Sequence, residues 1–220
     1  MPKVIKKRAK LDLETIPESD TPIVTIENIV STFSIGIAKL DLKSLANKLI
    51  YIDYNPHKFA AATMRLNYPR TTALLFSSGN VVCTGGKNTF ISRLAARKYV
   101  CLLQKSGLRV SMKNFKIQNI VATSFIDKPL KLREFANDYG AYTSYEPELF
   151  PGLVFRTIDP KVVFLVFRSG KIVITGAKEK GIVETIFQCF YHSILKKYVD
   201  TDMSTRCSAQ YRLNYNNRIE

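Results

Sequence analysis

The sequence is built from two copies of one unit. When each residue is set over the residue 91 positions later, LLFSSGNVVCTGGK at 74–87 falls on LVFRSGKIVITGAK at 165–178 without a gap. At the same offset, Asn28-Ile29-Val30 falls on Asn119-Ile120-Val121. Such units are too long for a solenoid repeat, so the sequence predicts a duplicated domain with an internal pseudo-two-fold. A molecule of this kind suits a partner that is itself roughly two-fold symmetric, as duplex DNA is.

Each unit reads as several antiparallel strands with two helices. Residues 72–76 and 80–84 are β-rich and flank the turn sequence Ser77–Asn80, which predicts a hairpin. Residues 25–34 and 60–66 predict further strands, and residues 42–49 predict a short helix. Residues 91–105 predict a longer helix, with its apolar face at Ile91, Leu94, Ala95, Tyr99 and Leu102. The fold class expected is α+β, with two repeats forming one curved antiparallel sheet and all helices on one side.

Alternation along the hairpin gives the sheet two largely apolar faces. One face takes Ala73, Leu75, Val81 and Cys83, and the other takes Thr72, Leu74, Phe76, Val82 and Thr84. The helices can cover only one face. The other is either a second core, closed by a partner subunit or a second sheet, or a binding surface. Its threonines and the basic chain around it favour a surface for the minor groove of DNA, whose floor offers few hydrogen-bonding groups.

The charge points to a polyanionic partner. The chain has 33 Lys and Arg against 18 Asp and Glu, a net charge of +15. Residues 1–22 account for only +1 (five bases, four acids) and residues 196–220 for +2 (five bases, three acids), which leaves +12 in the body. No acidic residue lies between Asp53 and Asp127, a stretch that holds eleven bases. Nucleic acid is the partner that this pattern favours, ahead of an anionic membrane or an acidic protein.

Several other classes of protein are disfavoured. No apolar run is long enough for a membrane span, and the basic N-terminus lacks the features of a secretory signal. Cys83, Cys101, Cys189 and Cys207 form no CxxC pair, so we expect buried free thiols rather than a zinc site or a disulfide framework. Val81 stands where a phosphate loop before Lys87 needs glycine. The two histidines have no nucleophile or paired carboxylates placed to use them, so we predict no enzyme, cofactor or metal.

Residues 23–198 resemble the conserved core of the TATA-box-binding proteins. The stretches that carry the resemblance are TTALLFSSG, VVCTGGK, SRLAARKYV, FKIQNIV and SYEPELFPGL, in the right order in both halves. The resemblance implies a saddle, in which a ten-stranded antiparallel sheet lays its concave side on DNA and carries four helices on its convex side. It implies a general transcription initiation factor that binds AT-rich promoter DNA in the minor groove, kinks it and nucleates assembly of the transcription machinery.

The resemblance also assigns roles to individual residues. Intercalation into the base stack falls to Phe59, Phe76, Phe150 and Phe167. Hydrogen bonds to the groove floor fall to Asn28, Asn119, Thr84 and Thr175. Apolar base contacts fall to Val30, Val82, Val121, Val173, Leu74 and Leu165. Phosphate contacts fall to Arg65, Arg156, Ser78, Ser169 and Lys171.

Protein partners are implied as well. Glu146, Glu148 and Leu149 match a loop that meets transcription factor IIB, whereas Arg93, Arg97, Lys98 and Lys105 match a helix that is presented to other factors, including factor IIA. The expected location is the nucleus or, for a viral member, the host nucleus or a viral factory. The expected organisation is a basic segment 1–22, repeats at 23–110 and 111–198, and an extension at 199–220 without an assigned role.

The chain departs from the family pattern at a few positions. Asn80 stands where lysine is usual, Arg168 stands where a small or apolar residue is usual, and Asn67-Tyr68 replaces an Arg-Glu pair. These changes keep open the alternative of a related or viral factor with a relaxed or different sequence preference. A remote alternative is a DNA glycosylase-like enzyme, which would need an added catalytic helical domain.

Overall fold

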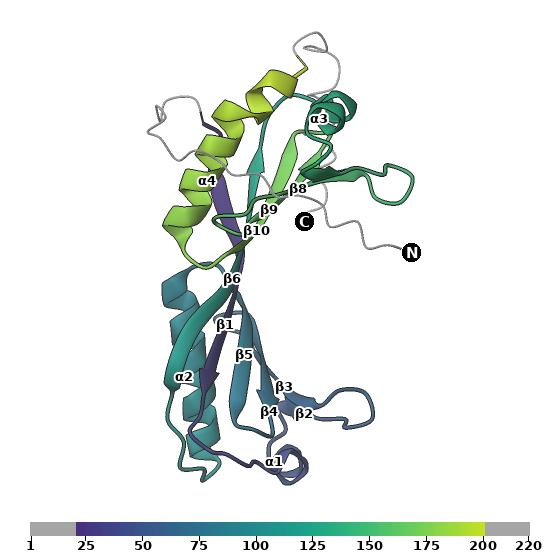
Figure 1. Cartoon of the computed structure of the whole chain (residues 1–220). Coiled ribbons are helices and arrows are strands. Elements are labelled where there is room, and N and C mark those ends of the chain that lie inside the picture. Colours follow the sequence, from purple (N-terminus) through teal and green to yellow (C-terminus); the bar gives the residue numbers. More distant parts are fainter. Residues whose placement is uncertain (1–20, 201–220) are drawn as a thin grey trace. The chain divides into compact units, whose positions relative to one another are not determined.

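The structure is a computed structural model that describes residues 21–200, so the predictions for residues 1–20 and 201–220 lie outside the described part of the chain (Figure 1). Ten strands form one antiparallel sheet in the order β2-β3-β4-β5-β1-β6-β10-β9-β8-β7. The single sheet confirms the predicted α+β fold. Its order also reflects the duplication, because the strands of the second repeat follow one another across the sheet in the reverse order of their mates in the first. None of the described helices is long and apolar enough to cross a bilayer.

The chain divides into two compact units. The amino-terminal unit spans Ile26–Val121, and the carboxyl-terminal unit begins at Ala122 and includes Thr21–Thr25. The elements of the first repeat are β1 (Val24–Ser34), α1 (Leu42–Lys48), β2 (Ile52–Asp53), β3 (Ala61–Leu66), β4 (Thr71–Phe76), β5 (Asn80–Gly86) and α2 (Thr89–Lys105). Those of the second repeat are β6 (Lys113–Phe125), α3 (Leu132–Asp138), β7 (Thr143–Ser144), β8 (Gly152–Arg156), β9 (Val163–Phe167), β10 (Lys171–Ala177) and α4 (Lys180–Ser193), followed by a 3₁₀ turn at Leu195–Tyr198.

The helices of the amino-terminal unit pack on the face of the sheet that the alternation predicted. Ala73, Leu75, Val81 and Cys83 are almost fully buried there. They share one cluster with residues of α1 and α2, including Leu45 and Tyr99. The helix expected at 91–105 begins earlier, at Thr89, because the Oδ1 atom of Asn88 accepts a hydrogen bond from the backbone N–H of Ile91 (2.7 Å) and caps it.

The predicted apolar face of α2 was partly wrong. Ile91, Leu94 and Leu102 are only partly buried, and the buried stripe is Ser92, Ala95, Ala96, Tyr99, Val100 and Leu103. These positions follow helical spacing, but Ser92 hides the pattern because serine reads as a surface residue. Its hydroxyl is satisfied inside the protein, where it lies 2.8 Å from the hydroxyl of Ser31 on β1.

The carboxyl-terminal unit fills the same backbone plan with aromatic rings. Phe155, Phe164 and Phe190 are fully buried, and the rings of Phe164 and Phe190 stack with centroids 4.1 Å apart. The repeat mates of these three residues are Met64, Ala73 and Tyr99. Each unit therefore has a core of its own composition, although the strand and helix plan is shared.

The β4–β5 and β9–β10 hairpins turn at equivalent glycines. Gly79 has φ +76° and Gly170 has φ +85°, a region that residues with a side chain rarely adopt. A Cβ atom at Gly79 would overlap the carbonyl oxygen of Ile37, and one at Gly170 would overlap that of Ile126. Both carbonyl groups of the glycines accept a 2.9 Å hydrogen bond, from Ile35 and Ile126 respectively. The two turns therefore present their side chains in the same way.

Candidate nucleic-acid interface

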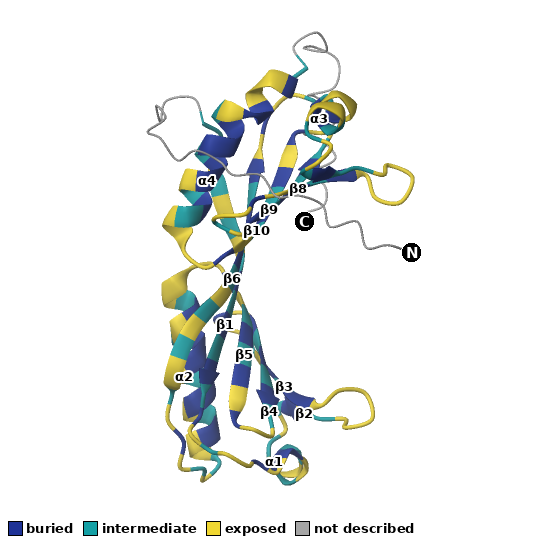
Figure 2. Ribbon diagram, viewed as in Figure 1, coloured by how far each residue is buried: buried dark blue, intermediate teal, exposed yellow. Residues whose placement is uncertain are grey.

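In each unit the sheet has one face that the helices leave uncovered, which we call the open face. Along β4 and β5, residues alternate between buried and partly exposed, and the partly exposed set is Thr72, Leu74, Phe76, Val82 and Thr84 (Figure 2). Leu165, Phe167, Val173 and Thr175 occupy the equivalent positions on β9 and β10 and are partly exposed too. The open face is thus apolar with a few hydroxyl groups, as the alternation predicted.

Asn28 is held on the open face of the amino-terminal unit with a fixed orientation. Its Oδ1 atom accepts hydrogen bonds from the backbone N–H of Gly85 (2.7 Å) and from the hydroxyl of Thr84 (3.1 Å). Because the carbonyl oxygen of the side chain faces β5, its –NH₂ group is the end that can donate hydrogen bonds to a partner. Asn28 therefore suits a partner that presents acceptors, and the minor-groove floor at A·T pairs presents only acceptors.

Two pairs of phenylalanines stand at equivalent places. Phe59 and Phe76 lie edge to face with ring centroids 6.4 Å apart, and Phe150 and Phe167 do so at 5.8 Å. Phe59 is 51% exposed and Phe150 is 41% exposed. Phe76 and Phe167 are only partly exposed, because each ring packs against its partner.

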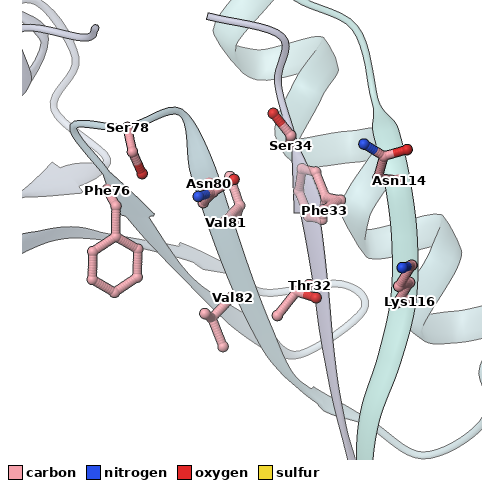
Figure 3. A pocket seen from close by; sticks show the side chains of 10 residues that line it. All are labelled: Thr32, Phe33, Ser34, Phe76, Ser78, Asn80, Val81, Val82, Asn114 and Lys116. Atoms are coloured by element: carbon pink, nitrogen blue, oxygen red, sulfur yellow. The ribbon is translucent and has the colours of Figure 1, made fainter. Parts of the chain in front are cut away.

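A groove of about 710 Å³ crosses the open face of the amino-terminal unit. Figure 3 shows Phe76, Val82 and Thr32 around it, with Asn80 and Ser34 near the hairpin turn. Lys116 from β6 contributes a positive charge to its lining. The groove is therefore open, mostly apolar at one side and polar at the turn.

The residues expected to contact phosphates are all exposed. Ser78 lies in the β4–β5 turn, and Ser169 and Lys171 lie in and after the β9–β10 turn. Arg65 and Arg156 are at equivalent places near the ends of β3 and β8. In the chain each serine follows a phenylalanine of the open face by two positions, so each turn carries an apolar and a polar group close together.

Two loops project from the sheet edges, one between β2 and β3 and one between β7 and β8, and both are largely exposed (Figures 1 and 2). The second loop carries Glu146, Glu148 and Leu149, and the side chain of Leu149 is 82% exposed. The backbone N–H of Leu149 bonds to the carbonyl of Glu146 (2.9 Å), which closes a turn that holds these residues outward. An apolar side chain with two carboxylates suits a protein partner better than DNA.

The basic helix α2 holds some of its cations against aromatic rings. The guanidinium of Arg93 lies 5.0 Å from the ring centroid of Phe115. The ammonium group of Lys98 donates to the carbonyl of Tyr68 (2.9 Å) and lies 5.3 Å from the centre of its ring. Arg97 and Lys105 are exposed. The helix is therefore a positive surface with partly fixed side chains.

The thiols differ from the prediction at one position. Cys83 and Cys189 are buried, but Cys101 is exposed, because it lies on the outer side of α2. Burial raises the pKa of the Cys83 thiol to about 11, which the hydrogen bond to Ser31 opposes. Cys207 lies outside the described residues. No cluster of potential metal ligands occurs within residues 21–200.

Sequence reasoning missed Gly152, which lies under the second phenylalanine pair. A Cβ atom there would come within 2.6 Å of a ring carbon of Phe150 and 3.1 Å of one of Phe167. The signal was present in the repeat, since the mate of Gly152 is another small residue, Ala61. Small side chains at this position leave room for two rings to meet.

Comparison with known proteins gives consistent results. The sequence matches the family "Transcription factor TFIID (or TATA-binding protein, TBP)" over residues 23–106 and 114–198. It is 49% identical to TATA-box-binding protein 2 of Arabidopsis thaliana, over 82% of this chain and 89% of that protein. It is 46% identical to TATA-box-binding protein 1 of Triticum aestivum, over 89% of this chain and 82% of that one. Among solved structures, the Methanococcus jannaschii TBP superposes with a TM-score of 0.68 at 38% identity, over 78% of this chain and 99% of that one.

Proposed function

The chain belongs to the TATA-binding-protein family, and from that premise we propose that it is a general transcription initiation factor that binds AT-rich promoter DNA in the minor groove and bends it. The observation that carries the proposal is the duplicated open face, which in each unit bears one edge-to-face phenylalanine pair beside a hairpin turn. Insertion of apolar wedges between base steps, with a kink of the duplex, is an established mode of minor-groove binding, which TATA-binding proteins use.

The proposed division of labour follows the chemistry of the side chains. Phe59, Phe76, Phe150 and Phe167 unstack one step at each end of the site. Asn28 and Asn119 meet the acceptors of the groove floor, and Thr84 and Thr175 form a second pair of base contacts beside them. The valines and leucines of the open face (Val30, Val82, Val121, Val173, Leu74 and Leu165) contact the bases and disfavour the amino group of guanine, which is the only donor in the minor groove.

The first experiment is a gel-shift assay with circularly permuted probes that carry a TATA site or a scrambled site. We expect tight binding with a large bend on the TATA probe only. Equal affinity and equal bend on both probes would favour the second candidate, a related factor with a relaxed sequence preference. Asn80 and Arg168 favour that candidate, because they place different charges at the two otherwise equivalent turns. Absence of binding to either probe would overturn both.

Salt dependence tests the phosphate contacts. The slope of log K against log salt is roughly −0.9 for each phosphate neutralised on duplex DNA. Arg65→Ala and Arg156→Ala should each make the slope shallower by about one. Ser78, Ser169 and Lys171 are proposed to add contacts at the turns. Unchanged slopes in both arginine variants would remove these residues from the list of phosphate contacts.

Protein partners form the next part of the proposal. The β7–β8 loop with Glu146, Glu148 and Leu149 is proposed to bind a factor IIB-like protein, and α2 with Arg93, Arg97, Lys98 and Lys105 a factor IIA-like protein. Glu146→Arg should abolish recruitment of the first while DNA affinity stays within about threefold, because a reversed charge repels the partner at a site away from DNA. Equal loss of both activities would contradict the assignment.

The proposed setting is the nucleus, with the two repeats at 23–110 and 111–198 acting as the two halves of a DNA-binding domain that engages the RNA polymerase machinery. The proposed function requires no catalysis, because binding and bending change no covalent bond.

A further inference from the structure

The two repeats place a Phe-Ser pair in opposite orders at the end of their first strand. The first repeat ends β1 with Phe33-Ser34, and the second ends β6 with Ser124-Phe125. The positions are equivalent in the structure, since the next residue in each case, Ile35 or Ile126, donates a 2.9 Å hydrogen bond to the hairpin glycine. The exchange therefore happens at one structural site.

The exchange reverses which side chain faces the core. In the amino-terminal unit Phe33 is 3% exposed, and Ser34 pairs with Asn80 at the edge of the groove (Figure 3). In the carboxyl-terminal unit Ser124 is 4% exposed, and the ring of Phe125 is 53% exposed on the open face. Residues two apart on a strand share a face, so Phe125 shares that face with Thr123.

This arrangement is unfavourable for folding alone. The hydroxyl of Ser124 is buried without a hydrogen-bond partner, and a large ring is left in water beside it. The core of this unit is already filled by Phe155, Phe164 and Phe190, so packing does not require Phe125. A local conflict of this kind is expected where a residue serves binding rather than stability.

The surroundings of Phe125 indicate what it binds. The register of the first repeat, in which Ser34 pairs with Asn80, places Phe125 beside Lys171 by the repeat relation. Arg168 and Lys171 are exposed in the same turn, whereas their mates Ser77 and Asn80 are uncharged. An exposed ring next to a lysine, with a second cation in the neighbouring turn, fits the edge of a DNA groove, where apolar sugar surface lies next to phosphate.

We propose that Phe125 is a further DNA-contacting residue, which packs on the sugar edge of the groove and makes the second repeat the tighter-binding half of the site. The proposal rests on the proposed function and deepens it. In a chain with two matched halves, either half could take either end of an asymmetric site. Phe125, Arg168 and Lys171 all add contacts to the same half, so they favour one orientation of the protein on DNA.

The test uses the full chain and an AT-rich duplex with three variants. Phe125→Ser gives the second repeat the serine that the first repeat has at the equivalent position, and Ser34→Phe gives the first repeat the phenylalanine of the second. The control, Phe90→Ser, removes a 73% exposed ring from α2, away from the open face. Fluorescence titration should show about tenfold weaker binding for Phe125→Ser, tighter binding for Ser34→Phe and a change within about twofold for Phe90→Ser. Thermal melting of the free proteins accompanies each titration, and Phe125→Ser should melt at or above the wild-type temperature.

The outcomes separate the two levels of the proposal. If the wild-type protein does not bind the duplex, the proposed function fails, and this inference fails with it. If the wild type binds and Phe125→Ser binds within about twofold of it, only the role of Phe125 is overturned. Loss of self-association at unchanged DNA affinity would identify a second copy of the chain as the occupant and would also overturn it. If Phe125→Ser melts at a lower temperature than the wild type, the affinity of Ser34→Phe becomes the deciding measurement. Binding no tighter than that of the wild type would then overturn the proposal.

Discussion

Phe150 and Phe167 lie edge to face with ring centroids 5.8 Å apart, closer than the 6.4 Å between their repeat mates Phe59 and Phe76. Gly152 explains the difference, because its absent side chain leaves space that Ala61 fills in the first repeat. The geometry of the second aromatic pair therefore depends on one hydrogen atom in place of a methyl group.

Gly152→Ala should disturb this pair. The new methyl group would come within 2.6 Å of a ring carbon of Phe150, so the ring must move. Overpacking of this kind destabilises by about 1–3 kcal/mol, and we expect a smaller bend angle of bound DNA together with weaker binding. Circular-permutation gel shifts and thermal melting measure the two effects.

The matched control is Gly181→Ala, since nothing lies within 4 Å of a Cβ atom at that position on α4. Alanine in place of glycine within a helix stabilises by roughly 0.5–1 kcal/mol, so this variant should melt higher and bend DNA normally. If Gly152→Ala behaved like the control, the close approach of the two rings would have no role in the bend.

The repeat explains why so much of this fold could be predicted from one sequence. Every strand of the first repeat has a counterpart in the second, so a feature that occurs in both, such as the hairpin turn with Gly79 or Gly170, is not expected to arise by chance. Alternation along β4 then separated the buried from the open face correctly, because the period of a strand is two.

What the sequence could not show are features that depend on tertiary contacts. The buried stripe of α2 was misread because Ser92 satisfies its hydroxyl against Ser31, which is 61 positions away. The partial burial of Phe76 depends on contact with Phe59, which belongs to a different strand-loop junction. Cys101 was expected to be buried from residue type alone, but the rotation of α2 places it outward. None of these contacts can be recognised from the pattern of neighbouring residues in the sequence.

The two repeats also provide a test of buried hydroxyl groups with opposite expected signs. Ser124→Ala removes a buried hydroxyl that has no hydrogen-bond partner, so it should raise the free energy of unfolding, by about 1 kcal/mol. Ser31→Ala instead breaks the 2.8 Å bond to Ser92 and leaves that buried group unsatisfied, so it should lower the free energy of unfolding by about 1–3 kcal/mol. Urea titration at neutral pH measures both, and a shift of the same sign in both variants would contradict the assigned hydrogen bonding.

Stability should fall at alkaline pH in part through Cys83. Burial raises the pKa of this thiol from its ordinary value of 9.0 to about 11, so the folded protein holds the proton more tightly than the unfolded chain does. The resulting stabilisation is complete below pH 9.0 and is lost as the pH rises to about 11. Tyr99, whose pKa burial raises to about 12, continues the loss above that range.

Cys83→Ala is the variant that isolates the thiol. The free energy of unfolding of the wild type, measured by urea titration at pH 8 and pH 11, should fall more steeply than that of Cys83→Ala, because alanine has no proton to lose. The exposed Cys101 serves as the control, and Cys101→Ala should keep the wild-type dependence. Parallel curves for wild type and Cys83→Ala would show that the thiol does not titrate within that window.

Truncation of the phenylalanine before each hairpin turn distinguishes a role in core packing from a role in DNA binding. A fully buried phenylalanine loses about 3–5 kcal/mol of folding stability on truncation to alanine, but Phe76 and Phe167 are partly exposed, and each contacts one ring that is itself exposed. We therefore expect Phe76→Ala and Phe167→Ala to lose clearly less than that range in the free protein. Their complexes should show the larger effect, with weaker binding and a smaller bend, because the ring that fills the opened base step is gone and unstacking costs a few kcal/mol per step.

The control is Phe164→Ala, which removes a fully buried ring of the carboxyl-terminal unit and should show the opposite pattern, a large fall in melting temperature. If Phe76→Ala and Phe167→Ala matched Phe164→Ala in melting temperature and bent DNA like the wild type, the repeated phenylalanines would serve the core, and the wedge mechanism would have lost two of its four residues.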